Sequence, residues 1–394
     1  MVRHLFILIW NKRKQHFLLM FEMLVSFMVI FGVFSLMVYY YQNYRKPMNF
    51  DYDRVWVINY NNALKTNNSD SLSLFYENVR KTLRSMPQIK GVSYASANLP
   101  FTETTNSTGL TYKNNRLNRI NNFIIDDEYA AVLNVRMLDG RWFNKTDAVS
   151  TNRPVVIDAA LKEAFFGKED AIGKFIGSHD NKTKMKVIGV VGNLKSRGDY
   201  TSIGPSVFAR VDTGAFHWLG NILVKVTPDA DAAFESHLYK SMANAMKNAN
   251  VEIEHLVDKR RSKNNFFLIP LIVITIVAGF LIVNVALGLF GVLWYNINTR
   301  RGEIGLRRAV GASRSSVSLQ LVGEALVLTT LSLITGTFFA IQFPLLNVGN
   351  VEAGVYLTAL VLAILFIYLL VLICSLYPGR QAAAIYPAVA LHED

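Results

Sequence analysis

Four long apolar stretches dominate the pattern of hydrophobic and polar positions along the chain. They cover residues 23–44, 266–299, 325–351 and 353–379. Each is long enough to cross a bilayer as a helix, which takes about 20 residues at about 1.5 Å of rise per residue. A buried helix of a soluble protein would instead carry a polar stripe toward water. The pattern therefore predicts four membrane-spanning helices.

Lys and Arg residues at the ends of these stretches predict the orientation, because basic flanks are retained in the cytoplasm. Basic residues precede the first stretch and fill the loop after the second, whereas Glu352 is the only charged residue of the loop between the third and the fourth. Both termini are therefore expected in the cytoplasm, with the large domain outside. The first residues are expected to lie along the inner membrane surface and to contact lipid head groups.

The predicted topology divides the chain into membrane and non-membrane segments. We expect a cytoplasmic amphipathic segment at 1–16, spans at 17–44, 266–295, 317–344 and 355–378, an outer domain at 45–265, a cytoplasmic loop at 296–316, a short outer loop at 345–354 and a cytoplasmic tail at 379–394. The outer domain has about 220 residues, enough for one or two domains with their own core.

At both ends of the outer domain, segments with apolar residues at strand spacing alternate with segments at helical spacing. A strand, a helix and a strand are predicted at 54–60, 72–86 and 92–97, and again at 222–226, 234–246 and 251–256. Shorter elements between them, at 154–157, 159–166 and 186–191, indicate an α/β insert at roughly 140–215. We expect an α-helical membrane protein with four transmembrane helices and a large α/β domain, in which two β-α-β units bracket the insert.

The net charge of +12 raises the question of nucleic-acid binding. Residues 42–265 hold 31 Lys and Arg and 23 Asp and Glu, scattered without a basic run except at 259–263. That run directly precedes a predicted span, where phospholipid head groups are its expected partners. We therefore expect membrane lipid and no nucleic acid among the partners. The only cysteine, Cys374, lies in the fourth span, so the outer domain is expected to be stable without disulfides.

Motifs of catalysis and cofactor binding are incomplete in this sequence. Residues 167–175 read GKEDAIGKF, but five residues separate the glycines and Phe175 stands where Ser or Thr would hold magnesium. The seven histidines form no pair at the spacing of a zinc-binding helix. We expect no cofactor or metal in this chain and no enzymatic activity of its own. A Ser-His-Asp triad stays open, because its members can be distant in sequence.

The predicted inner loop at 299–317, TRRGEIGLRRAVGASRSSV, is amphipathic when projected as one helix. Leu306, Ala309, Val310 and Val317 fall on one side and the arginines on the other, with Ile304 in the middle of the basic side. If the first side lies on the membrane, Ile304 faces the cytoplasm as an apolar contact ringed by charge, which suits docking to a partner. The alternative, that the arginines only set the topology, fits the pattern equally well.

This loop resembles the inner loop of the MacB-like and FtsX-like ABC permease family, whose pattern is a basic pair, E-I-G and R-A-x-G-A. The matching positions are Arg300, Arg301, Glu303, Ile304, Gly305, Arg308, Ala309, Gly311 and Ala312. The outer segment with GRWFNKTDA, RPVVIDAALKEAFFGKEDAIGKFIG and KVIGVVGNLKS is similar to the family's core domain, and YPAVALHE at 386–393 looks like its C-terminal ending.

The resemblance implies a bacterial inner-membrane protein with a periplasmic core domain. It implies a dimer, of this chain with itself or with a related permease, docked on two copies of a cytoplasmic ABC ATPase. The ten residues expected to dock are the nine matching positions and Arg307. ATP and Mg²⁺ would be bound by the ATPase, and closure of the ATPases would be passed to the periplasmic domains through extensions of the first two spans.

Two roles stay open within this family. In the first, the periplasmic domain expels a peptide, a drug or a lipoprotein, with a periplasmic adaptor and an outer-membrane channel as candidate partners. In the second, the protein moves no solute and activates a periplasmic enzyme such as a cell-wall hydrolase. The large outer domain favours the first role by analogy, because regulators in this family have outer domains of about 100 residues.

Overall fold

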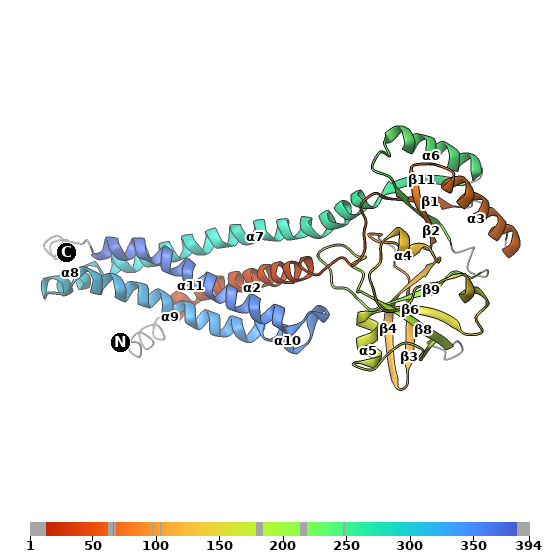
Figure 1. Ribbon diagram of the computed structural model, residues 1–394. Coiled ribbons are helices and arrows are strands. Elements are labelled where there is room, and N and C mark those ends of the chain that lie inside the picture. The colour runs from red at the N-terminus through yellow and green to blue at the C-terminus, as the bar shows by residue number, and fades with distance from the viewer. Residues whose placement is uncertain are drawn as a thin grey trace. The chain divides into compact units, whose positions relative to one another are not determined.

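The structure is a computed structural model of the chain and divides it into two compact units (Figure 1). It describes residues 13–61, 66, 68–96, 98–102, 105–178, 184–212, 219–246 and 249–383. The membrane unit consists of 1–42 and 268–394, and the α/β unit of 43–267. Most of the predicted amphipathic segment at 1–16 and the C-terminal motif at 386–393 lie outside the described residues.

The membrane unit contains four helices that are long and apolar enough to cross a bilayer. They are α2 (Arg13–Tyr44), α7 (Leu256–Thr299), α9 (Arg314–Ala340) and α11 (Ala353–Ala383). Helix α10 (Gln342–Leu345) and the 3-10 turn η3 (Val348–Asn350) connect α9 to α11. The predicted fold class, four transmembrane helices with a large α/β domain, is confirmed.

Close helix packing in the membrane unit depends on a glycine at one contact. The side chains of Phe27 and Phe31 on α2 are fully buried in the core of the unit. A Cβ atom on Gly336 of α9 would lie 2.5 Å from the ring of Phe27, so only glycine permits this approach of α9 to α2.

The first lobe of the α/β unit is an antiparallel sheet in the order β11-β1-β10-β2. Its strands and helices are β1 (Val55–Asn61), α3 (Ser69–Arg84), β2 (Ile89–Ala95), β10 (Asn221–Val226), α6 (Ala232–Ala245) and β11 (Asn250–His255). The side chains of Asn68 and Asp231 cap α3 and α6 by accepting bonds from backbone N–H groups. Both helices pack on one apolar core with the sheet, and the two predicted β-α-β units are confirmed.

The second lobe is a closed ring of six strands, paired in the order β4-β3-β7-β8-β6-β9 and back to β4. They are β3 (Ser107–Tyr112), β4 (Asn115–Ile125), β6 (Arg153–Asp158), β7 (Phe175–Ser178), β8 (Lys184–Val191) and β9 (Ser206–Arg210). Strand β5 (Met137–Gly140) pairs with β8 beside the ring, and the helices are α4 (Tyr129–Val132), η1 (Lys145–Val149) and α5 (Ala159–Phe166).

The boundary of the predicted insert is therefore wrong. The insert was placed at roughly 140–215, but the ring already begins at Ser107 with β3 and β4. Strand β4 reads NRLNRINNFII and leaves most of its first half exposed, so it lacks the apolar alternation of a half-buried strand. One pair, Ala95 with Ile125, joins the ring to the first lobe in a continuous sheet.

Candidate docking helix and helix junction

The predicted docking loop folds into a separate short helix, α8 (Arg301–Ala309). After α8 the chain turns at Gly311, whose φ of 102° is the left-handed conformation that favours glycine. Helix α9 then starts with Ser313 as its N-cap, its hydroxyl accepting a bond from the N–H of Ser316. The expectation of one continuous helix through 299–317 is wrong, and Val317 belongs to a different helix from Leu306.

Ile304 is buried inside the membrane unit and does not face the cytoplasm. Its side chain is 7% exposed and packs with Ile297 of α7 and with Val317 and Leu321 of α9. The prediction that Ile304 is the exposed apolar contact is therefore wrong. The turn at Gly311 is the physical reason, because it brings the start of α9 against the side of α8 that holds Ile304.

The exposed apolar residues of α8 and its C-cap are Leu306 and Val310. Leu306 is 55% exposed and Val310 is 82% exposed. They lie four positions apart, which places them on one face of the helix, and Gly302 and Ala309 are also exposed there. This face, defined by Gly302, Leu306, Ala309 and Val310, is called the open face of α8 below.

Charged side chains connect α8 to the end of α7 and the start of α9. Arg300 donates to Glu324 of α9 at 3.0 Å and to Glu303 at 3.1 Å. Arg307 donates to Glu303 and, at 2.7 Å, to Gln320 of α9. The hydrogen bond from Arg300 lowers the pKa of Glu303 from its usual value, so this carboxylate stays ionised beside the two arginines.

The structure divides the ten predicted docking residues among three environments. Ile304 and Gly305 are buried; Arg300, Arg301, Arg308 and Ala312 are half-buried; Glu303, Arg307, Ala309 and Gly311 are exposed. Arg308 donates to the carbonyl of Ala312 at 2.9 Å and so fixes the turn after α8. The role of these residues in docking stays a prediction, and Leu306 and Val310 join the candidates.

A second candidate site lies in the α/β unit, where the β8–β9 loop (residues 192–205) contacts the chain next to both long helices. Lys195 is 3% exposed, and its ammonium group donates to the carbonyls of Tyr44 and Lys46, both at 3.2 Å. Burial lowers the pKa of Lys195 from its usual value. These bonds hold the C-terminal end of α2 to the loop.

The same loop holds the start of α7 through a buried carboxylate. Asp199 accepts two bonds from Arg260, at 3.1 and 2.7 Å, and one from the amide of Asn264 at 2.7 Å. The Asp199 side chain is 4% exposed, so this charge is almost fully removed from water. Gly198 has a φ of 105°, and a Cβ there would meet Lys263 at 3.2 Å, so the turn requires glycine.

We call the group of Lys195, Asp199, Arg260 and Asn264 the helix junction. Sequence reasoning did not find it, because Asp199 and Arg260 are 61 positions apart and no motif connects them. The only signal in the sequence is a glycine next to a charged residue in a polar loop, which is common. Among the described residues, no group of three His, Cys, Asp or Glu side chains is arranged to hold a metal ion.

Four candidate spans joined to a large α/β unit define a multi-pass membrane protein with a large domain outside the bilayer. Residues 17–238 match the MacB-like periplasmic core domain, and residues 275–387 match the FtsX-like permease C-terminal domain. The chain therefore belongs to the family of MacB-like and FtsX-like ABC permeases.

Known proteins resemble the chain at low identity. It is 26% identical over 339 residues to the macrolide export ATP-binding/permease protein MacB of Rhodopseudomonas palustris (strain HaA2), covering 80% of this chain and 48% of the relative. It is 23% identical over 340 residues to the uncharacterized ABC transporter permease YvrN of Bacillus subtilis (strain 168), covering 81% of this chain and 79% of YvrN. The chain thus spans about half of the first of these relatives.

Among solved structures, the periplasmic region of MacB from Actinobacillus actinomycetemcomitans is similar with a TM-score of 0.39 and 19% identity. That comparison covers 55% of this chain and 94% of the MacB region.

Proposed function

We propose that this chain is the membrane subunit of an ABC export machine and passes the work of a cytoplasmic ATPase to its periplasmic α/β unit. The observation that carries the proposal is α8, which presents the open face at the loop that matches the permease family. Relatives such as MacB of R. palustris are named as ATP-binding/permease proteins, which supports an ATPase as the partner.

The docking contact in this proposal is the open face of α8 rather than Ile304. Leu306 and Val310 give two apolar side chains beside exposed Arg307, a combination typical of a helix that fits a groove on a protein partner. Basic residues on this loop also support a cytoplasmic position for α8 and for both termini.

Helix α7 is the proposed route of force between α8 and the α/β unit. It comprises 44 residues, Leu256–Thr299, which span about 66 Å at 1.5 Å per residue, and the helix junction holds its second turn at Arg260. A helix that is held near its start by Asp199 passes a displacement of its far end to the β8–β9 loop, and Pro270 is a position at which this helix can bend. The junction also holds the end of α2 through Lys195, so both segments would move together.

The test of docking is a mild-detergent purification of the tagged chain from its own membranes, followed by an ATPase assay of the eluate. The variant carries Leu306→Glu and Val310→Glu. The matched control carries Leu74→Glu and Val149→Glu, two apolar residues of the α/β unit that are 65% and 88% exposed. We expect ATPase activity with the wild type and the control and none with the α8 variant. Equal recovery from all three proteins would contradict docking through the open face.

We place the export role first because relatives are named for macrolide export and because the large α/β unit favours export by analogy with the family. Peptides, drugs and lipoproteins are the proposed substrate classes, with a second permease copy as the proposed dimer partner. The same eluate separates export from signalling: a co-purified periplasmic hydrolase, activated by wild-type protein and not by the α8 variant, would favour the signalling role instead.

A further inference from the structure

Strand β11 forms a free edge of the first lobe. It is the end strand of the sheet, and among the described residues it pairs with β1 alone. Six residues of β11 span about 20 Å at about 3.3 Å per residue. The backbone groups on the outer side of such a strand are available to pair with another extended segment.

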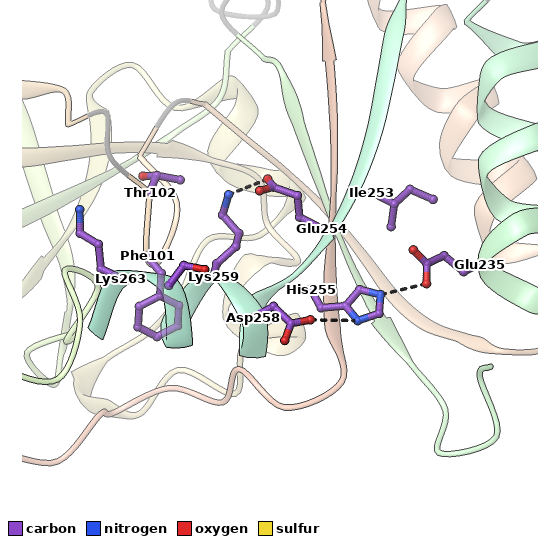
Figure 2. Close-up of a pocket in the computed structure, with 10 residues that line it drawn as sticks. Phe101, Thr102, Glu235, Ile253, Glu254, His255, Asp258, Lys259 and Lys263 are labelled. Carbon is purple, nitrogen blue, oxygen red and sulfur yellow. Dashed lines mark hydrogen bonds and ion pairs between the residues drawn. The ribbon is translucent and has the colours of Figure 1, made fainter. Parts of the chain in front are cut away.

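A groove follows this edge between β11, α6 and the start of α7. One hollow of about 440 Å³ lies between α6 and the residues 251–253. A second of about 610 Å³ continues past His255 to the start of α7 (Figure 2). The two hollows share Glu235 and Ile253, and together they border residues 251–255 of the strand.

The part of the groove beside α6 is acidic. Its lining includes Glu235 and Glu252 and no Lys or Arg. Glu252 makes no ion pair with any residue that the structure describes, and among these residues the carboxylate of Glu235 pairs only with His255, at 3.2 Å. Tyr239, which is 47% exposed, adds an aromatic face on which a cationic side chain can lie.

In the other part of the groove, acidic side chains already contact basic ones. Lys259 contacts Glu254 at 2.6 Å, and His255 lies between Glu235 and Asp258 (Figure 2). His255 is also held by stacking on Trp56, with ring centroids 4.6 Å apart. Among the described residues of the groove, the acidic side chains without a Lys or Arg partner are therefore Glu235 of α6 and Glu252 of β11.

We infer that this groove binds an extended peptide segment, which adds a strand to β11 and brings lysine or arginine side chains to Glu252 on one face of the sheet and to Glu235 on the face that carries α6. Strand addition supplies backbone hydrogen bonds, and the hollows receive side chains of the segment. A second copy of β11 is a poor occupant, because antiparallel pairing of the two strands brings Glu252 and Glu254 close to the same carboxylates of the copy. The inference goes beyond the docking and coupling proposed above and involves neither α8 nor the helix junction.

The test uses the full chain in nanodiscs of zwitterionic lipid, so that anionic lipid does not bind the probe. The probe is a fluorescent peptide of alternating threonine and lysine, seven residues long, and its binding is followed by anisotropy. Two matched peptides carry glutamate in place of lysine, or N-methyl groups on every internal amide. The protein variants are Glu252→Gln and Glu235→Gln, with Glu163→Gln on the exposed side of α5 as the control.

We expect binding of the lysine peptide, about fivefold weaker with Glu252→Gln and unchanged with Glu163→Gln. The glutamate and N-methylated peptides should not bind. No binding of the lysine peptide up to about 1 mM would overturn the inference. Equal binding of the N-methylated peptide would also overturn it, because strand addition needs free amides. Displacement of the peptide by self-association of the protein would assign the edge to a second copy and reject a peptide partner.

Discussion

The helix junction and the network around α8 use the same kinds of ion pair in different surroundings. At the junction, the Asp199 side chain is 4% exposed and its partner Arg260 is 28% exposed. At α8, Glu303 is 44% exposed and its partners Arg300 and Arg307 are 20% and 46% exposed. Water and salt therefore screen the charge of Glu303 much more than that of Asp199, whereas Glu324, the other partner of Arg300, is only 15% exposed.

This difference suits the two parts of the proposed function. Removing one partner of a buried pair leaves an unpaired buried charge, so the junction resists being opened and holds α7 firmly to the β8–β9 loop. The exposed charges of Glu303 and Arg307 on α8 contribute little to stability and remain available to a partner that binds and leaves. The comparison predicts large stability changes at the junction and small ones at α8, with functional changes at both.

The largest effect is expected from Asp199→Ala. Arg260 and Asn264 lose their shared acceptor, and we expect the free energy of unfolding to fall by about 3 kcal/mol. Thermal unfolding of the purified protein and hydrogen exchange of the β8–β9 loop measure it. The control is Glu169→Ala, which removes a surface pair with Lys174 in the same lobe. If both variants lose the same stability, the distinction between buried and screened pairs fails.

The next largest change in the free energy of unfolding is expected at Asp158, a buried carboxylate, and this change depends on pH. Burial raises the pKa of Asp158 to about 6 from its usual 3.8. Between these values the folded state binds more protons at Asp158 than the unfolded state, so the contribution of this group to stability is greatest below pH 4 and is lost as pH rises through 6. Two pKa units correspond to about 3 kcal/mol.

Asp158→Asn should remove this pH dependence, because asparagine can still cap α5 but does not ionise. We expect the variant to gain about 2 kcal/mol over the wild type at pH 8 and nothing at pH 4. Thermal unfolding across pH 4–8 measures the difference. Parallel pH curves for the two proteins would exclude Asp158 as the source.

The next change in stability distinguishes the two apolar positions of α8, Ile304 and Leu306. Ile304→Ala should lower the free energy of unfolding of the membrane unit by about 2 kcal/mol, because it leaves a cavity among Ile297, Val317 and Leu321. Leu306→Ala should change it by less than about 0.5 kcal/mol, since Leu306 is exposed. Hydrogen exchange of α8 compares them, and greater loss with Leu306→Ala would reverse the assignment of the two faces.

The smallest effect is expected from Glu303→Gln. Arg300 keeps its bonds to Glu324 at 3.0 and 3.1 Å, so the loss should stay below about 0.5 kcal/mol. Thermal unfolding of the variant in low and in high salt tests this. A loss that is large and independent of salt would place Glu303 with the buried pairs of the junction.

Much of this fold could be predicted because short stretches of sequence determine the spans and several of the helices and strands. Apolar length predicted the four spans, and the helical spacing of Leu72, Val79 and Leu83 predicted α3 between two strands. Only some strands of the six-stranded ring could be predicted from the sequence. Strand β4 is polar, and its pairing with β9 joins segments about 85 residues apart. Pairing of distant strands leaves no signal in the period of either strand.

The candidate sites show the same limit at the level of single residues. The motif located the candidate docking loop, but a projection that treats 299–317 as one helix puts Ile304 on the wrong side. Gly311 and Ser313 carried the missing information, as a helix-ending glycine followed by a capping serine. The junction could not be predicted, because a bond between Asp199 and Arg260 exists only once the sheet has brought the β8–β9 loop to α7.

The place of β1 between β10 and β11 has a consequence for how the protein is made. Strand β1 ends at Asn61 and its neighbours begin only at Asn221 and Asn250, so it is synthesised about 160 residues before the first of them. At about 5–20 residues per second, β1 waits roughly 10–30 s without either partner. The centre of the sheet can close only when α7 begins to emerge. Folding of the α/β unit and insertion of the second span are therefore completed together.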